Sequence, residues 1–167
     1  LGLYHFLLKN NHLPTVISPN EFPHFLEWLP GSETVKVFEK DTEECTKILE
    51  EAELIFTLDF NALHRVGDEM EKVLAEMKAP FIMIDHHQYP QGFEQYTYWD
   101  DKSSSTSELV YRLISESNNL QFVDKDIAGC LYTGIMADTG SFKHSNCSGN
   151  THRIAADLID FGIDHVA

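Results

Sequence analysis

Two apolar runs that each close on an aspartate constrain the fold of this chain more than any other feature. The first is LIFTLDF, residues 54–60, and the second is PFIMID, residues 80–85. Strands that are covered on both faces of a parallel sheet have this near-continuous apolar composition. Between the two runs, apolar residues at helical spacing predict a crossover helix: Val66, Met70, Val73, Leu74 and Met77.

The rest of the chain alternates between the same two kinds of element. Stretches 15–18, 35–38 and 96–99 are rich in β-forming residues and predict further strands. An amphipathic pattern ends near residue 11, and further helices are predicted after the caps Asn20, Asp41, Ser105, Asp124 and Thr151. The pairs Asp41/Glu44 and Ser105/Glu108 also have the spacing of a capping box. This alternation predicts an α/β fold with a doubly wound, mostly parallel sheet flanked by helices.

Charge and cysteine content exclude several classes of protein. Against 27 Asp and Glu there are 12 Lys and Arg, a net charge of −15, so no broad positive field exists for a long nucleic acid or an anionic membrane. Three distant cysteines, Cys45, Cys130 and Cys147, form no Cys-x-x-Cys pair and no disulfide framework, which fits a reducing cytoplasm. The apolar runs are far shorter than the roughly 20 residues that span a bilayer, so we expect a cytoplasmic protein without a membrane partner.

Acidic and imidazole side chains stand at the ends of the buried elements. Asp59 follows the first apolar run, the triplet Asp85, His86 and His87 follows the second, and Asp138 ends an apolar helical stretch in GIMADTGSF. In open parallel sheets, ligands bind just beyond the carboxyl ends of the strands. Carboxylate and imidazole ligands together suit Mn²⁺, Fe²⁺, Co²⁺ or Zn²⁺. Two such ions sharing one carboxylate would clamp a phosphoryl group and activate a water molecule.

Each of these residues also has an ordinary structural interpretation. Asp59 and Asp138, taken singly, are typical of caps and turns, and the histidine pair is typical of a solvated loop. His144 and His152 follow Asp138 and are weaker candidates to lie near a substrate. The placement of all the clusters at element ends favours the metal site.

Four segments together resemble the DHH phosphoesterase superfamily: FTLDFNALHRVG, MIDHHQYP, KSSSTSELVYRLI and GIMADTGSFKHSN, in this order along the chain. The superfamily includes manganese-dependent inorganic pyrophosphatases, single-strand exonucleases, cyclic-dinucleotide phosphodiesterases and small oligoribonucleases. The Ser-Ser-Thr-Ser-Glu helix start and the Asp-Thr-Gly-Ser-Phe stretch are most similar to the NrnA-like branch of bifunctional nanoRNases and 3′-phosphoadenosine-5′-phosphate phosphatases.

The resemblance implies a role for each candidate residue. Asp59 would bridge two Mn²⁺ ions, with Co²⁺ or Mg²⁺ as alternatives, and His86 and Asp138 would complete the shell of one ion. His87 would contact the scissile phosphate, and Asp85 would orient a neighbouring histidine or add to the metal shell. His144 is a further substrate-binding candidate. The implied reaction is hydrolysis of short oligoribonucleotides or of 3′-phosphoadenosine-5′-phosphate. The resemblance thus implies nucleic acid binding and the activity of an oligoribonuclease or exonuclease.

Two family features have no counterpart in residues 1–167: a His-x-Asp-x-Asp loop after the first strand, and a C-terminal substrate-binding domain. We therefore expect a partial DHH catalytic domain that lacks its first strand and is weakly active or inactive alone. We expect it to work together with a C-terminal substrate-binding domain of the same protein. A homodimer is a further option. Two alternatives stay open. They are a cyclic-dinucleotide phosphodiesterase of the same family and a non-catalytic Rossmann-like nucleotide-binding module.

Overall fold

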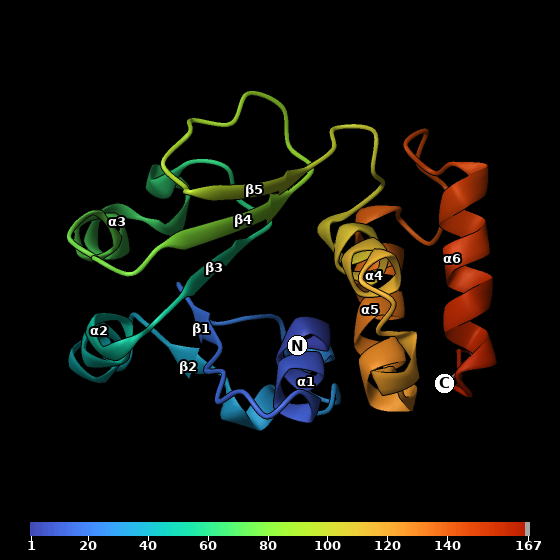
Figure 1. Ribbon diagram of the computed structural model, residues 1–167, viewed down its shortest axis with the longest axis horizontal. Helices are drawn as coiled ribbons and strands as arrows, with labels where there is room; N and C mark the ends of the chain where they lie inside the picture. Colours follow the sequence, from blue (N-terminus) through green and yellow to red (C-terminus); the bar gives the residue numbers. More distant parts are fainter. Residues whose placement is uncertain (166–167) are drawn as a thin grey trace.

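The computed structural model describes residues 1–165 (Figure 1). The α-helices are α1 (Gly2–Lys9), α2 (Thr42–Glu51), α3 (Asp68–Ala75), α4 (Thr106–Glu116), α5 (Lys125–Asp138) and α6 (Gly149–Asp160). The strands are β1 (Ile17–Ser18), β2 (Lys36–Val37), β3 (Ile55–Leu58), β4 (Phe81–Asp85) and β5 (Tyr96–Trp99). Short 3-10 helices are η1 (His24–Leu26), η2 (Ser32–Thr34), η3 (Leu63–Val66) and η4 (Leu120–Phe122).

The strands pair in parallel, as the two apolar runs predict. In the larger sheet the order is β3-β4-β5, with Ile55 opposite Phe81 and Ile82 opposite Tyr96. β1 and β2 pair with each other in a separate two-stranded sheet. Helix α3 makes the predicted crossover between β3 and β4. The α/β class with parallel sheets flanked by helices is confirmed, with the strands divided between two sheets.

Helices cover both faces of the larger sheet and bury a different core on each. Because successive side chains of a strand point to opposite faces, Phe81 and Ile84 of β4 enter different cores. Figure 1 shows α2 and α3 on one side of the sheet and α1, α4, α5 and α6 on the other. The core on the side of α2 and α3 consists of Phe38, Cys45, Leu49, Ile55, Val66, Met70, Leu74 and Phe81. The other core is built from Leu3, Ile84, Leu109, Val110, Tyr111, Ile114, Val123, Ile127, Ala128, Leu131, Ile135, Ile154 and Leu158.

The prediction of a helix after Asn20 is wrong. The segment forms only η1, and the side chain of Phe25 is 70% exposed instead of buried. Pro23 stands immediately before η1 with a backbone ψ of 136°. Proline has no N–H to donate and its ring clashes with a preceding helical turn, so a helix cannot run through this position.

The predicted helix starts are correct at some positions and wrong at others. Ser105 and Asp124 cap α4 and α5 by accepting hydrogen bonds from backbone amides. The side chain of Asp41 caps nothing in α2, because its backbone (φ −129°, ψ 52°) lies outside the extended conformation that aims a cap at the helix. Helix α6 begins at Gly149 instead of after Thr151, since Ser148 and Thr151 form the capping box together.

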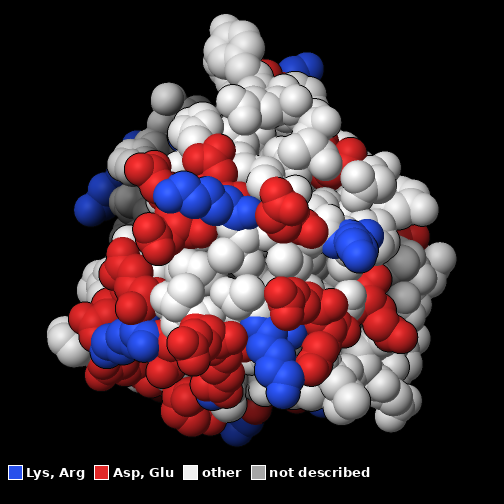
Figure 2. Space-filling view, turned by 90° about the vertical axis from the view of Figure 1, so that its left-hand side faces the viewer, with Lys and Arg blue, Asp and Glu red and all other residues white. Residues whose placement is uncertain are grey.

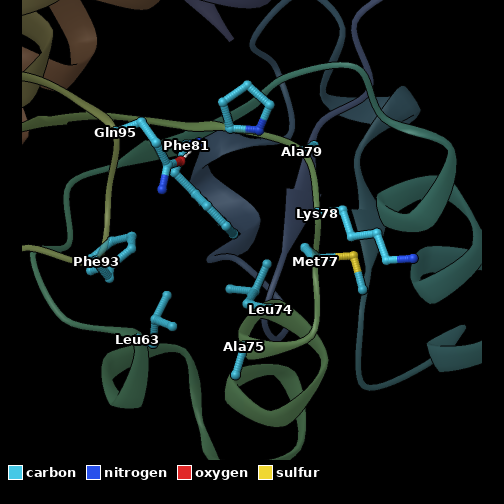
Figure 3. Close-up of a pocket in the computed structure, with 10 residues that line it drawn as sticks. Leu63, Leu74, Ala75, Met77, Lys78, Ala79, Phe81, Phe93 and Gln95 are labelled. Atoms are coloured by element: carbon cyan, nitrogen blue, oxygen red, sulfur yellow. Dashed lines mark hydrogen bonds between the residues drawn. The ribbon is translucent and has the colours of Figure 1, made fainter.

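A hollow of about 560 Å³ opens at the amino end of β4, beside α3 (Figure 3). Its lining is apolar apart from Lys78, Gln95 and backbone groups. Phe81, which lines it, begins β4, whereas Asp85 ends the same strand. The hollow therefore lies at the opposite end of the sheet from the predicted metal ligands. None of the helices in residues 1–165 combines the length and the hydropathy that a membrane crossing requires.

Candidate metal centre

The carboxyl ends of β3 and β4 bring two of the predicted clusters together. Asp59 directly follows β3, Asp85 is the last residue of β4, and the two histidines come next in the chain. The amide of Asp59 donates a 3.1 Å hydrogen bond to the carbonyl of Ile84 across the two strands. The backbone of Asp59 has a φ of +68°, a left-handed conformation that aspartate tolerates better than most residues.

His86 lies between two carboxylates that come from different elements. Its Nε2 is 3.5 Å from Oδ1 of Asp59 and 3.5 Å from Oδ2 of Asp138, which is the last residue of α5. The Nδ1 of the same ring is 3.2 Å from the carbonyl oxygen of Ser103. A carbonyl can only accept, so Nδ1 donates this bond, and in the neutral ring Nε2 keeps a lone pair that faces the two carboxylates.

Asp85 and His87 form a second pair beside the first. Oδ1 of Asp85 is 2.8 Å from Nδ1 of His87, and the two imidazole rings of His86 and His87 lie 4.7 Å apart. Asp85 is fully buried, and its Oδ2 has no hydrogen-bond partner among the described residues. Buried carboxylate oxygens are costly without a partner, so this arrangement orients the ring of His87 at the expense of one unsatisfied oxygen.

The local charges favour a cation between Asp59 and Asp138. Burial raises the pKa of Asp59, but the hydrogen bond that His86 donates when its ring is protonated and the hydrogen bond from Thr106 outweigh it and hold that pKa below its usual value. The hydrogen bond to Asp59 raises the pKa of His86, against the opposing effect of burial. Burial and the charge of Asp59 raise the pKa of Asp138. Two carboxylates thus compete for one positive charge at this position.

Three side chains that sequence reasoning did not single out brace the cluster. The hydroxyl of Thr106 donates a 2.8 Å hydrogen bond to Oδ1 of Asp59. The buried amide of Asn61 donates to the carbonyl of His87 (3.2 Å) and to that of the next residue (2.8 Å), and the indole of Trp99 donates to the same His87 carbonyl (2.7 Å). The only signals in the sequence were that Asn61 follows Asp59 by two positions and that Thr106 belongs to a run of hydroxyl residues.

The two weaker histidine candidates lie in different surroundings. Nδ1 of His144 is 3.1 Å from the backbone carbonyl of Asp138, which places the exposed imidazole beside the cluster. His152 stacks on Phe142, with ring centroids 5.4 Å apart, and its Nε2 lies 3.6 Å from Sγ of Cys147. These contacts place His144, and not His152, directly against a predicted ligand.

The side chains of this cluster fit a divalent cation. Asp59, His86 and His87 offer ligand atoms that all lie within 4.8 Å of one another, and Asp138 approaches the same His86 nitrogen. A donor set of carboxylate oxygen and imidazole nitrogen without thiolate suits Mn²⁺, Fe²⁺, Co²⁺ or Zn²⁺. The unpartnered Oδ2 of Asp85 adds a buried acceptor next to this set.

Residues 1–135 match the model of a family described as "DHH family, N-terminal domain". The chain belongs to the DHH family. Relatives named NrnA are among the proteins that it matches, so the resemblance drawn from the four sequence segments is confirmed.

Individual relatives agree with this membership. The chain is 35% identical over 86 residues to the probable bifunctional oligoribonuclease and PAP phosphatase NrnA of Streptococcus mutans, covering 52% of this chain and 27% of that relative. It is 30% identical over 152 residues to a probable manganese-dependent inorganic pyrophosphatase of Streptococcus equi subsp. equi, covering 75% of this chain and 47% of the relative. An exopolyphosphatase-related protein from Bacteroides fragilis has the same fold, with a TM-score of 0.94 at 43% identity over 98% of this chain and 48% of that one. The DHH chain described here therefore spans less than half the length of these relatives.

Proposed function

We propose that this chain forms the metal-binding part of a phosphoesterase that hydrolyses short oligoribonucleotides, 3′-phosphoadenosine-5′-phosphate, or both, with Mn²⁺ as its cofactor. The observation that carries the proposal is the position of His86, whose Nε2 lies 3.5 Å from each of two carboxylates while its Nδ1 donates to a backbone carbonyl. Family membership supports phosphoester hydrolysis as the reaction class.

In this proposal Asp59, His86 and Asp138 hold the cation. A divalent cation supplies positive charge for a phosphoryl group and lowers the pKa of a water molecule that it binds. Asp59 is the carboxylate that a second cation would share, which makes two ions per complete site. The hydrogen bond from Thr106 fixes Oδ1 of Asp59, so the carboxylate keeps one orientation towards His86.

His87 and Asp85 serve the substrate side of the proposed site. Asp85 is buried and holds Nδ1 of His87 at 2.8 Å. Both ring nitrogens of a protonated histidine donate, so in that form Nε2 of His87 would be the donor to a phosphate oxygen. Asn61 and Trp99 hold the carbonyl of the same residue, so both its ring and its backbone are fixed. His144, beside Asp138, is a second group that can contact the substrate phosphate.

The charge of the chain supports a short substrate. A net charge of −15 disfavours long nucleic-acid tracks, whereas local cations at Asp59 and Asp138 offset that charge for a small phosphoester. In this proposal, further ligands and a substrate-binding domain belong to the same protein, as the expected partial DHH domain implies. Inorganic pyrophosphate is a second candidate substrate, because a relative named as a manganese-dependent pyrophosphatase aligns with 75% of this chain.

The experiment is a side-by-side assay of the full-length protein on dinucleotides, 3′-phosphoadenosine-5′-phosphate, cyclic di-AMP and pyrophosphate, with Mn²⁺ and with EDTA. We expect Mn²⁺-dependent hydrolysis of the first two substrates, and at least about a 100-fold loss in His86→Ala, since even groups that only support metal ligands are worth 10- to 100-fold. His24→Ala is the matched control, because this exposed imidazole pairs with Glu27 and belongs to η1, not to the ends of β3, β4 or α5. Preferential cleavage of pyrophosphate or cyclic di-AMP would overturn the substrate assignment. Absence of all hydrolysis would favour the non-catalytic nucleotide-binding module.

A further inference from the structure

Glu108 is a buried carboxylate to which the proposed mechanism assigns no role. It lies in the first turn of α4, is 3% exposed, and receives hydrogen bonds from four donors. Ser104 contributes its backbone amide (3.3 Å) and its hydroxyl (2.6 Å), and α6 contributes the Thr151 hydroxyl (2.9 Å) and the Asn150 amide (3.4 Å). Every partner donates, so both oxygens of Glu108 act as acceptors, as in an ionised carboxylate.

No Lys or Arg of residues 1–165 lies within ion-pair distance of Glu108. A buried charge without a counter-ion is costly and persists only where its hydrogen bonds are satisfied. The spacing of Ser105 and Glu108 predicted a capping box, but only half of it forms. Ser105 caps α4 by accepting from the amide of Glu108, whereas the carboxylate turns to Ser104 and Thr151.

The segment that Glu108 holds is in direct contact with the metal centre. Residues 103–106, called the serine loop below, are all at least 94% buried. The carbonyl of Ser103 accepts from Nδ1 of His86, and the hydroxyl of Thr106 donates to Asp59. Ser104 stands between these two contacts and is anchored to Glu108 through both its amide and its hydroxyl.

We propose that Glu108 is a positioning residue of the metal centre, which acts by fixing the serine loop against His86 and Asp59. This inference rests on the proposed function, because it concerns the cation that Asp59, His86 and Asp138 would hold. With the loop fixed, the Ser103 carbonyl keeps the proton of His86 on Nδ1 and leaves Nε2 free for a cation. Thr106 at the same time keeps the Asp59 carboxylate aimed at that nitrogen.

A purely structural role would instead make Glu108 a link between α4 and α6, and the chain offers a matched control for that role. The hydroxyl of Tyr111 donates a 3.0 Å hydrogen bond to Asp157, which also joins α4 to α6 and involves neither Glu108 nor the serine loop. Tyr111→Phe removes this link alone.

The experiment compares wild type, Glu108→Ala, Glu108→Gln and Tyr111→Phe in the full-length protein. Calorimetry measures Mn²⁺ binding, ¹⁵N NMR of labelled histidine reports the tautomer of deprotonated His86, and thermal unfolding reports stability. We expect Glu108→Ala to weaken Mn²⁺ binding about 10- to 100-fold and to mix the tautomers of His86. Glu108→Gln keeps an oxygen acceptor for Ser104 and restores most of the affinity. Tyr111→Phe lowers the unfolding temperature without changing either the affinity or the tautomer.

Unchanged Mn²⁺ affinity and an unchanged tautomer in a destabilised Glu108→Ala would overturn the inference and leave the proposed function standing. Wild type that binds no Mn²⁺ would overturn the proposed function, and the tautomer measurement, which needs no metal, would still decide the position of His86. If Glu108→Ala does not fold, Ser104→Ala carries the test, because it removes one hydroxyl from the loop and keeps Glu108. The same two outcomes, weaker binding with mixed tautomers or no change in either, then support or overturn the inference.

Discussion

Asp59 suits its position both through its backbone conformation and through its carboxylate. Its φ of +68° suits aspartate or asparagine, and its carboxylate lies 3.5 Å from His86. The sequence identified Asp59 because it follows a buried run. The hydrogen bond from Thr106, 47 residues further along the chain, depends on how α4 packs against the sheet, and no local pattern contains that information.

Asn61 tests how much one buried amide contributes. The side chain is 5% exposed and donates to two carbonyls of the loop that carries His87. In Asn61→Ala the carbonyl of Gln88 loses this donor while that of His87 keeps the indole of Trp99, and we expect a loss of about 1–3 kcal/mol in the free energy of unfolding. Urea denaturation measures it. The control Asn119→Ala removes only an exposed bond to Ser117 and should change stability by less than about 0.5 kcal/mol. Equal losses in both variants would contradict this account.

At the scale of the elements, the aspartates that predicted two helix starts do stand at the N-cap position, but not both of them form the capping hydrogen bonds. Asp41 and Asp124 both stand at the N-cap, but only Asp124 accepts hydrogen bonds from its helix, at 3.2 and 3.1 Å. Both have the residue type that favours this position, and the difference lies in the backbone conformation, which residue type alone does not determine.

The two aspartate caps give a matched pair of variants. We expect Asp124→Ala to lower the free energy of unfolding by about 1 kcal/mol at neutral pH, and Asp41→Ala to lower it far less. Burial raises the pKa of Asp124, but hydrogen bonds from Lys9 and from the amides of Ile127 and Asp126 outweigh this effect and lower it. A lowered pKa means that the cap contributes fully above about pH 4, the ordinary aspartate value, and that the contribution disappears as the pH falls through the lowered pKa. Chemical denaturation of both variants between neutral and acidic pH measures this. A cost of Asp124→Ala that grows in acid would contradict the assignment.

Two glycines of α5 test how closely this helix approaches α4. A methyl group on Gly134 would come within 2.8 Å of Cβ of Ser107, whereas the nearest side-chain atom to a methyl on Gly129 is 3.9 Å away, in Ile163. Gly134→Ala should therefore destabilise the protein by about 1–3 kcal/mol through overpacking. Gly129→Ala should stabilise it by about 0.5–1 kcal/mol through helix propensity. Thermal unfolding of the two variants should give shifts of opposite sign, and a stabilising shift in Gly134→Ala would show that the helices are not in close contact at Gly134.

For the molecule as a whole, hydrophobic patterning was sufficient to predict the α/β class and the parallel pairing of β3 with β4. It was not sufficient to predict that β1 and β2 form a sheet of their own, because the composition of a strand does not determine which other strand it pairs with. The candidate site was predictable because its main residues sit at element ends. The residues that brace it, Asn61 and Glu108, were not, since their partners are far away in sequence.

One face of the molecule carries many acidic side chains. Figure 2 shows the face that carries α2 and α3, where acidic side chains crowd together around few lysines. The exposed acidic residues of these helices include Glu43, Glu44, Glu50, Glu51, Asp68 and Glu69. Like charges on one face repel one another, and this repulsion destabilises the compact folded state.

Screening this repulsion should stabilise the protein. We expect NaCl, raised from about 10 mM to about 150 mM, to increase the unfolding temperature by about 2–4 °C, because the Debye length falls from about 30 Å to about 8 Å. Calorimetry at constant pH measures the shift, with an equal concentration of sucrose as the uncharged control. A fall in the unfolding temperature would mean that the surface ion pairs outweigh the repulsion.

The central claim is that Asp59, His86 and Asp138 together hold a divalent cation. Crystals of the full-length protein grown with Mn²⁺, with diffraction data collected at the manganese absorption edge, test it most directly. The account predicts an anomalous peak in bonding contact with Nε2 of His86 and with carboxylate oxygens of Asp59 and Asp138, and no such peak in His86→Ala. Anomalous peaks found only on the acidic face of α2 and α3 at saturating Mn²⁺ would contradict this claim. The absence of a metal at Nε2 of His86 under the same conditions would contradict it too.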